Sequence, residues 1–291
     1  MKKIAILVIV LCFSTLTLQA DPWEKAFDLG LNLTQNTYSD SWSGGEAGNL
    51  TWVAKADGVF QKQIKPTVNF KSTLKFAFGQ THTQDKTSKN WAKPEKSTDK
   101  IDIENLFRLT KDWGVDPYFA VRFESQFLDA TVDGINRYFN PMLWTESAGV
   151  SRIVYKTETD ELLTRLGLAY RQNVQSIIVD TAADLRNWET ATDGGLESVT
   201  DFKYTISESL NYVGKMSLYK AFIYSDKDVL EGTPMEDDWK SIDVNFENTF
   251  SASVAKYITV SLYIQVLYDK QINKKGRLKE TLAMGLTYKL F

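Results

Sequence analysis

Cysteine and histidine are almost absent, with one of each in 291 residues. Cys12 lies inside the unbroken apolar run Ile4–Phe13, so a chain that loses this run can form no disulfide bond. His82 stands alone, and one histidine without a cysteine cannot assemble a zinc site. The mature chain must therefore be held by burial and hydrogen bonds, and we expect neither a metal nor a cofactor.

Long apolar runs and a basic excess are also missing. Beyond Phe13 no run approaches the ~20 residues that a membrane-spanning helix requires, which excludes a helical membrane protein. Acidic residues outnumber basic ones by 37 to 34, which argues against a nucleic-acid partner. Disorder is excluded as well, because aromatic residues make up 13% of the chain.

Residues 1–20 have the features of a secretory signal for Sec-type export. Lys2 and Lys3 precede the apolar run, and smaller, more polar residues follow it up to Ala20. Cleavage after Ala20 would leave residues 21–291 as one domain, remove Cys12 and change the formal charge from −3 to −5.

Period-two alternation is the dominant pattern and recurs about a dozen times. Over residues 67–79, for example, Phe70 and Phe76 take one phase and Lys71 and Lys75 the other. A strand with this pattern has one apolar face and one polar face. We predict strands at residues 26–36, 48–60, 67–79, 100–110, 116–128, 146–156, 162–173, 199–210, 215–224, 240–254, 258–268 and 278–290.

The connections between these strands alternate in length. Short turns are predicted at residues 61–66, 111–115, 157–161, 211–214 and 255–257, and long polar loops at 37–47, 80–99, 129–145, 174–198, 225–239 and 269–277. Short turns at one end and long loops at the other are typical of outer-membrane barrels. An even number of strands would place both termini at the periplasmic, short-turn end.

The polar phase distinguishes a membrane barrel from a soluble one. A soluble barrel buries its apolar face and shows its polar face to water. Here the face predicted to line the lumen carries Lys71, Lys75, Asp102, Glu104, Arg108, Arg122, Glu124, Arg165, Arg171, Asp243 and Glu247. We therefore predict an all-β fold, a closed antiparallel up-and-down transmembrane β-barrel of about 12 strands, located in the bacterial outer membrane and in contact with its lipid.

Two strands fit this scheme less well. Lys220 falls in the apolar phase of its strand, where a lysine facing mid-bilayer lipid would cost ~2–4 kcal/mol. A bulge, a neighbouring protomer in a homo-oligomer, or a wrong register would each account for it. In residues 146–156, Arg152 and Val154 share a phase, which leaves the register there open.

The chain ends on alternating apolar residues and a terminal aromatic, Phe291. This ending resembles the C-terminal signal that outer-membrane barrels present to their insertion machinery, which we therefore expect as a partner. Phe291 is one residue out of phase with Tyr288, and a terminal kink would absorb the difference.

Several segments resemble an uncharacterised family of bacterial outer-membrane barrels, the domain of unknown function 3078. The segments are Leu31–Gln35, Ser41–Glu46, Trp239 with Val244–Asn248, Lys256–Ile258 and Tyr268–Lys270. The resemblance implies an outer-membrane barrel and brings no catalytic residues.

Three features suggest chemistry, and each has a simpler structural explanation. Outer-membrane phospholipases place a serine two residues after a histidine, but Gln84 stands there after His82 and cannot act as a nucleophile. The acidic loop 226–238 matches no calcium-loop spacing and is expected to be a solvated surface loop. Trp42 either holds a ligand or marks the membrane interface. We predict no enzymatic activity, so lipid hydrolysis is disfavoured.

Inward-facing charges of both signs allow two functions. They can line a narrow or gated pore for a small solute or ion, or they can cross-link the lumen into a closed barrel whose outer loops bind a partner or ligand. A barrel of about twelve strands is wider than one of eight, which side chains fill. Water in the lumen is expected to keep each ion pair near ~0–1 kcal/mol.

Overall fold

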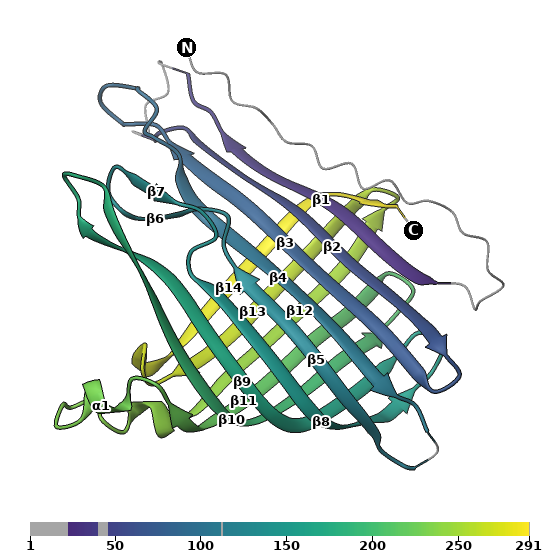
Figure 1. Cartoon of the computed structure of the whole chain (residues 1–291). Helices are drawn as coiled ribbons and strands as arrows, with labels where there is room; N and C mark the ends of the chain where they lie inside the picture. The colour runs from purple at the N-terminus through teal and green to yellow at the C-terminus, as the bar shows by residue number, and fades with distance from the viewer. Residues whose placement is uncertain (1–22, 40–45, 112, 291) are drawn as a thin grey trace, which may run out of the picture.

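The computed structural model describes residues 23–39, 46–111 and 113–290, which form a closed barrel of twelve antiparallel strands (Figure 1). The barrel strands are β1 (Glu24–Asn36), β2 (Asn49–Lys65), β3 (Val68–Thr83), β4 (Glu95–Leu109), β5 (Asp116–Ser125), β8 (Met142–Lys156), β9 (Glu161–Asp180), β10 (Leu185–Thr205), β11 (Leu210–Tyr224), β12 (Ile242–Ala255), β13 (Ile258–Asp269) and β14 (Asn273–Lys289). Each pairs with the barrel strand before and after it, and β1 pairs with β14. The predicted all-β class, up-and-down order and strand number are confirmed.

The remaining elements lie in the long connections. A small hairpin, β6 (Asp129–Val132) and β7 (Ile135–Arg137), stands between β5 and β8, and a helical turn α1 (Lys227–Leu230) with a 3-10 turn η1 (Asp238–Lys240) joins β11 to β12. Figure 1 shows β6 and β7 at the upper left and α1 at the lower left, whereas the last strand ends at the right. Among the described residues no helix has the length and apolar character needed to cross a membrane.

Strand register keeps one face of the sheet polar around the wall. Directly opposed residues share a face, and one row joins ionisable residues on six successive strands. The row runs through Glu124, Asp102, Lys75, Asp57, Asp28 and Lys289. The side chains of the other phase include most of the exposed large apolar residues, such as Leu31, Phe119, Leu168 and Leu282.

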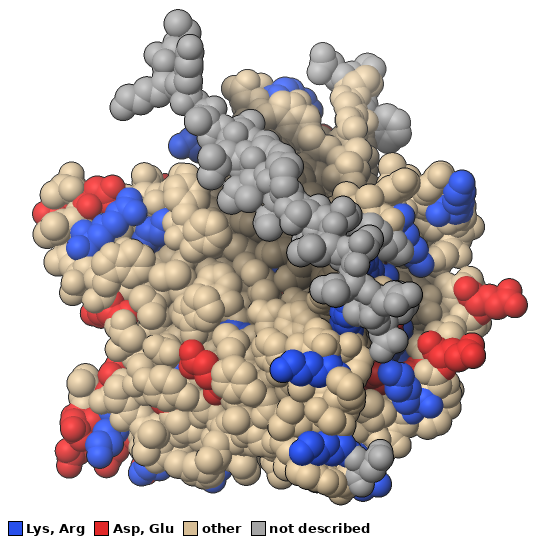
Figure 2. Space-filling model, turned by 45° about the vertical axis from the view of Figure 1, so that its right-hand side comes forward, with Lys and Arg blue, Asp and Glu red and all other residues tan. Residues whose placement is uncertain are grey.

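This apolar face is the outside of the barrel. On the side that Figure 2 shows, broad uncharged areas separate charged groups that gather towards the left and right. An exposed apolar surface of this extent is not stable in water and indicates contact with lipid. Every strand of a closed barrel is hydrogen-bonded to two neighbours, so few backbone N–H and C=O groups would face hydrocarbon without a hydrogen-bond partner.

The predicted strand ends are wrong in several places. Most of the predicted loop 174–198 is strand, because β9 and β10 leave only residues 181–184 between them, and β13 and β14 leave only 270–272 of the loop 269–277. Extended hairpins beyond the membrane meet water on both faces, so they show no apolar alternation. The predicted turn 211–214 is also wrong: residues 206–209 form the turn, and Asn211 and Gly214, typical turn residues, lie within β11.

Lys220 and Arg152 both face outward. Lys220 lies opposite Leu196 on β10 and Ile242 on β12. The nearest register shift with β10 comes later in β11, after Ala221, so neither a bulge nor a wrong register explains why Lys220 points outward. It is four residues from the end of β11, where a long side chain can reach the aqueous interface. Arg152 is close to the short-turn end of β8, and the register shift at Val154 comes after it.

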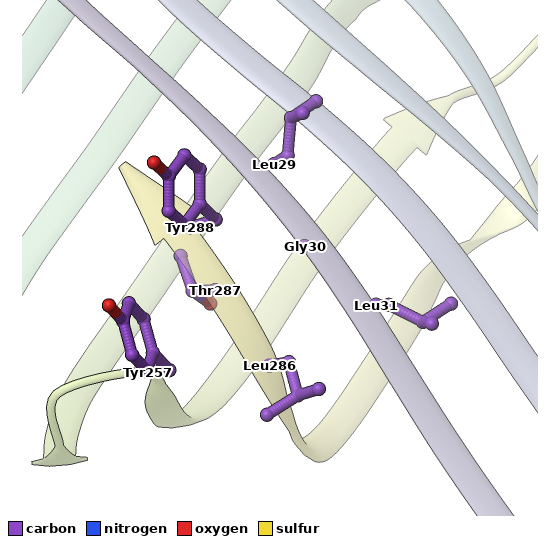
Figure 3. Close-up of a pocket in the computed structure, with 7 residues that line it drawn as sticks. All are labelled: Leu29, Gly30, Leu31, Tyr257, Leu286, Thr287 and Tyr288. Carbon is purple, nitrogen blue, oxygen red and sulfur yellow. The ribbon is translucent and has the colours of Figure 1, made fainter. Parts of the chain in front are cut away.

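The barrel closes on a short seam. Only five residue pairs join β1 to β14, from Asp28 opposite Lys289 to Asn32 opposite Gly285. At Gly285 a Cβ would lie 2.5 Å from the Leu31 carbonyl oxygen, so the close approach of the two strands requires glycine. Figure 3 shows the outer groove along this seam, where Tyr288 stacks on Tyr257 of the β12–β13 turn.

Some predictions fall on residues that the structure does not describe. The predicted signal at residues 1–20, the segment 41–45 around Trp42, and Phe291 lie outside the described ranges. These three remain predictions.

Candidate functional site in the barrel interior

Salt bridges cross the barrel from wall to wall. Glu104 on β4 pairs with both Arg165 on β9 and Lys215 on β11, although β4 is not hydrogen-bonded to either strand. A side chain can join strands on different parts of the wall only through the interior. Glu104 is 8% exposed and Arg165 is 2% exposed, so these charges are buried.

A second cluster joins β3 and β4 to β12. The Glu247 carboxylate lies 2.8 Å from Lys100 Nζ and 3.4 Å from Lys75 Nζ, and it accepts a hydrogen bond from Gln265. Next to it, both oxygens of Asp102 accept hydrogen bonds of 2.9 Å from Arg122. The Arg122 guanidinium also lies 2.9 Å from Glu124, completing a continuous network of opposite charges.

A third cluster lies nearer the long loops. Arg171 on β9 is held between Asp193 on β10, at 2.8 Å, and Asp243 on β12, at 2.9 Å. Its guanidinium stacks 3.6 Å from the ring centre of Tyr219. Above this cluster, Trp239 from η1 packs against inward-facing Ala169, Tyr219 and Ala221. The β11–β12 loop therefore covers part of the barrel mouth.

Towards the short turns the interior is partly apolar. Leu106, Tyr118, Ala120 and Leu163 form a buried cluster on the inner face of β4, β5 and β9. Beside it Lys71 reaches Glu161 at 3.2 Å and Arg108 lies 3.4 Å from Asp116.

The interior consequently has two unlike halves. Inward side chains of β4, β5 and β8 to β12 form a packed half, in which many of them are buried. Inward side chains of β13, β14, β1 and β2 form an open half. On β1, β13 and β14 no described inward residue is buried, and on β2 only Gln61 is. Asp57 on β2 and Lys279 on β14 are exposed to solvent.

All eleven residues predicted to line the lumen take part in this interior network. They are Lys71, Lys75, Asp102, Glu104, Arg108, Arg122, Glu124, Arg165, Arg171, Asp243 and Glu247. Sequence reasoning missed six of their partners: Lys100, Asp116, Glu161, Asp193, Asp201 and Lys215. Asp193 and Lys215 also point inward. Asp193 falls in the predicted loop 174–198, and Lys215 directly follows the wrongly predicted turn 211–214.

Burial changes the expected energetics of these pairs. The expectation of ~0–1 kcal/mol assumed water around each pair, and it is wrong for Glu104 with Arg165, because both are buried. Removing one partner of a buried pair leaves an uncompensated charge and costs about 3–5 kcal/mol. The buried Nε atoms of Arg108 and Arg165 have no hydrogen-bond partner, so the network is not fully satisfied.

The other candidate sites acquire structural roles. Gln84 accepts a hydrogen bond from the Gly48 amide and donates one to the Lys89 carbonyl oxygen, so its side chain holds a loop together. The acidic loop is not simply solvated, since Asp238 is buried and lies 2.9 Å from Lys270. Among the described residues no group of acidic or histidine side chains is arranged to hold a metal ion.

The loop between β5 and β8 is held together by charged residues of its own. Asp129 lies 2.7 Å from Arg137 and accepts a hydrogen bond from Asn140, whose own oxygen accepts one from the Ser176 amide on β9. Burial opposes ionisation of Asp129, but the hydrogen bonds from Asn140 and Thr131 outweigh it and hold the pKa of this carboxyl below its usual range. The loop is therefore tied to β9 at neutral pH.

A closed antiparallel barrel with an apolar outer face and a charged interior defines a transmembrane β-barrel. Residues 33–130 match the model of the family described as Protein of unknown function (DUF3078), which confirms the predicted resemblance over that part of the chain. The later segments that carried the resemblance, from Trp239 onwards, lie outside the match.

Comparison with solved structures gives barrels of low sequence identity. An outer membrane channel from Pseudomonas putida F1 is 10% identical, with a TM-score of 0.41 over 94% of this chain and 96% of that one. The translocator domain of the autotransporter NalP from Neisseria meningitidis is 10% identical, with a TM-score of 0.36 over 91% and 86%. The NanC porin is 9% identical, with a TM-score of 0.38 over 90% and 98%. Comparison with curated proteins gives no match.

Proposed function

We propose that the protein is a narrow channel of the bacterial outer membrane, through which small solutes or ions pass along the open half of the barrel. The observation that supports this most is the contrast between the two halves. Inward side chains of β13, β14 and β1 remain accessible to solvent, whereas those facing them across the barrel are packed and cross-linked.

Barrel size is consistent with a passage of this kind. Side chains fill a barrel of eight strands, whereas sixteen-stranded porins leave a wide aqueous channel. In a twelve-stranded barrel, side chains from one side can close part of the lumen and leave a passage beside the other. Glu104 and Glu247 contact the cations that reach across the packed half, so the remaining passage would be narrow and off-centre.

The outer-membrane location follows from the same physics. The exposed apolar face requires lipid, and closed barrels of this type are the strand-built solution to spanning a bilayer. Solute passage without chemistry also suits a packed half whose charges neutralise one another. We therefore propose no enzymatic activity.

The experiment is single-channel conductance of the purified protein in planar bilayers, with a variant that obstructs the open half. Ala283 faces inward from β14, and replacing it with tryptophan should reduce the conductance of each channel. Ala54 faces outward from β2 and is exposed, so Ala54→Trp is the matched control and should conduct like the unmodified protein.

Absence of conductance in the unmodified protein would overturn the proposal and leave a closed barrel whose loops bind a partner. Equal conductance of Ala283→Trp and Ala54→Trp would show that solutes do not follow the open half.

A further inference from the structure

We propose that the passage selects small anions, and that Lys55 and Lys279 are the side chains that determine this selectivity. The inference rests on the proposed channel and names the class of solute that it would carry. It starts from the lysines that face the open half without forming a salt bridge.

Lys55 and Lys279 both point into the barrel. Lys55 on β2 lies opposite Gly30 and Ala77, and Lys279 on β14 lies opposite Gln265. Each of these partners belongs to the inward phase of its strand. In the part of the chain that the structure describes, neither lysine forms a salt bridge.

Lys279 extends across the interior. Its Nζ donates a hydrogen bond of 3.3 Å to Thr98 Oγ1 on β4, although β1, β2 and β3 lie between β14 and β4 along the wall. An anion passing between β14 and β4 would therefore meet this ammonium group. The charges of Lys100, Lys55 and Glu247 all act on Lys279, so three cationic side chains and one carboxylate, which already holds Lys100, lie around the same space.

The charges of the open half do not balance. The inward phase of β1, β2, β13 and β14 carries five cationic side chains, Lys55, Lys275, Arg277, Lys279 and Lys289, against the four carboxylates of Glu24, Asp28, Asp57 and Asp269. Lys289 lies directly opposite Asp28, which offsets one pair. Lys75 and Lys100 are held by Glu247, so the packed half contributes little net charge.

A positive excess of this kind concentrates anions. An ammonium group about 7 Å from a passing ion in water changes its local concentration by about threefold. The effect should weaken at high salt, because screening shortens the range of the charges. Water-accessible lysines that form no salt bridge can act in this way, whereas the ion-paired lysines of the packed half cannot.

The test is the reversal potential of the purified protein in planar bilayers under a potassium chloride gradient. The unmodified protein should prefer chloride to potassium, and the double variant Lys55→Gln with Lys279→Gln should lower that preference by about threefold for each charge removed. Lys279→Arg keeps the charge and should keep the preference. Lys86→Gln removes one charge from an exposed loop and should leave the preference unchanged.

The outcomes separate this inference from the proposed channel. Conductance with a preference for potassium, or a chloride preference that survives Lys55→Gln with Lys279→Gln, overturns the inference and leaves the channel intact. A protein that never conducts overturns both.

Discussion

Glu104 is the carboxylate that pairs with two cations of the packed half, buried Arg165 and half-buried Lys215. It contacts Arg165 and Lys215 and is 8% exposed, whereas Glu124 has only Arg122 as its ion-pair partner. Arg122 would keep Asp102 if Glu124 were neutralised. The two glutamates lie in the same network, yet they should respond differently to the same substitution.

Glu104→Gln should therefore lower the free energy of unfolding by about 3–5 kcal/mol, because Lys215 loses its ion-pair partner and buried Arg165 keeps only Asp201, at 3.5 Å. Glu124→Gln should cost about 1 kcal/mol or less, since its side chain is 28% exposed and its partner stays paired. The measurement is the unfolding midpoint in detergent, with urea as denaturant. Conductance of Glu104→Gln should also rise, because loosening the packed half widens the lumen. Equal midpoints for the two variants would mean that the network adds little stability.

At the scale of the element, every barrel strand must keep one face towards lipid and the other inward. Phe76 on β3 takes the outward phase and packs near Phe127, whereas Thr73 on the same strand takes the inward phase opposite Glu104. A change of one residue in register would exchange these environments.

Phe76→Arg should cost about 2–4 kcal/mol and impair membrane assembly, since it places a charge against lipid. Thr73→Arg should be tolerated, because a cation there faces the Glu104 carboxylate. The amount of each variant recovered in the outer-membrane fraction provides the comparison. Better assembly of Phe76→Arg than of Thr73→Arg would show that the inward and outward phases are reversed.

Most elements, but not their ends, could be predicted from the sequence. Apolar and polar residues must alternate where one face of a strand meets lipid and the other meets water, so the central part of each strand can be predicted from the sequence. Beyond the membrane, residues such as Trp188 and Glu189 of β10 are exposed on either face, and the pattern disappears although the hairpin continues. The turn before β11 was misplaced because Gly214 resembles a turn residue, whereas it lies inside the strand.

At the scale of the whole molecule, closure of the ladder is the feature that gives stability. Twelve strands are each hydrogen-bonded to two neighbours, and the shortest contact is the five-pair seam between β1 and β14. Unfolding in detergent must break the ladder somewhere, and this seam has the fewest pairs to break.

The unheated protein should therefore migrate differently from the boiled protein on a denaturing gel, because a closed ladder resists detergent until it is heated. Samples heated in steps and run side by side give the transition temperature. Identical migration at all temperatures, together with recovery in the soluble periplasmic fraction, would contradict the membrane-barrel assignment.

The sequence by itself determined the all-β class, the strand number and the face that each central residue takes, because these depend on local alternation between two solvents. The inward phase of Lys75, Asp102 and Glu247 is a property of this kind. Only the tertiary structure decided which charges meet, since Glu104 and Lys215 are 111 residues apart and touch across the lumen. It also decided that the interior has a packed half and an open half, because that division depends on which side chains reach across the closed barrel, and no single strand carries this information.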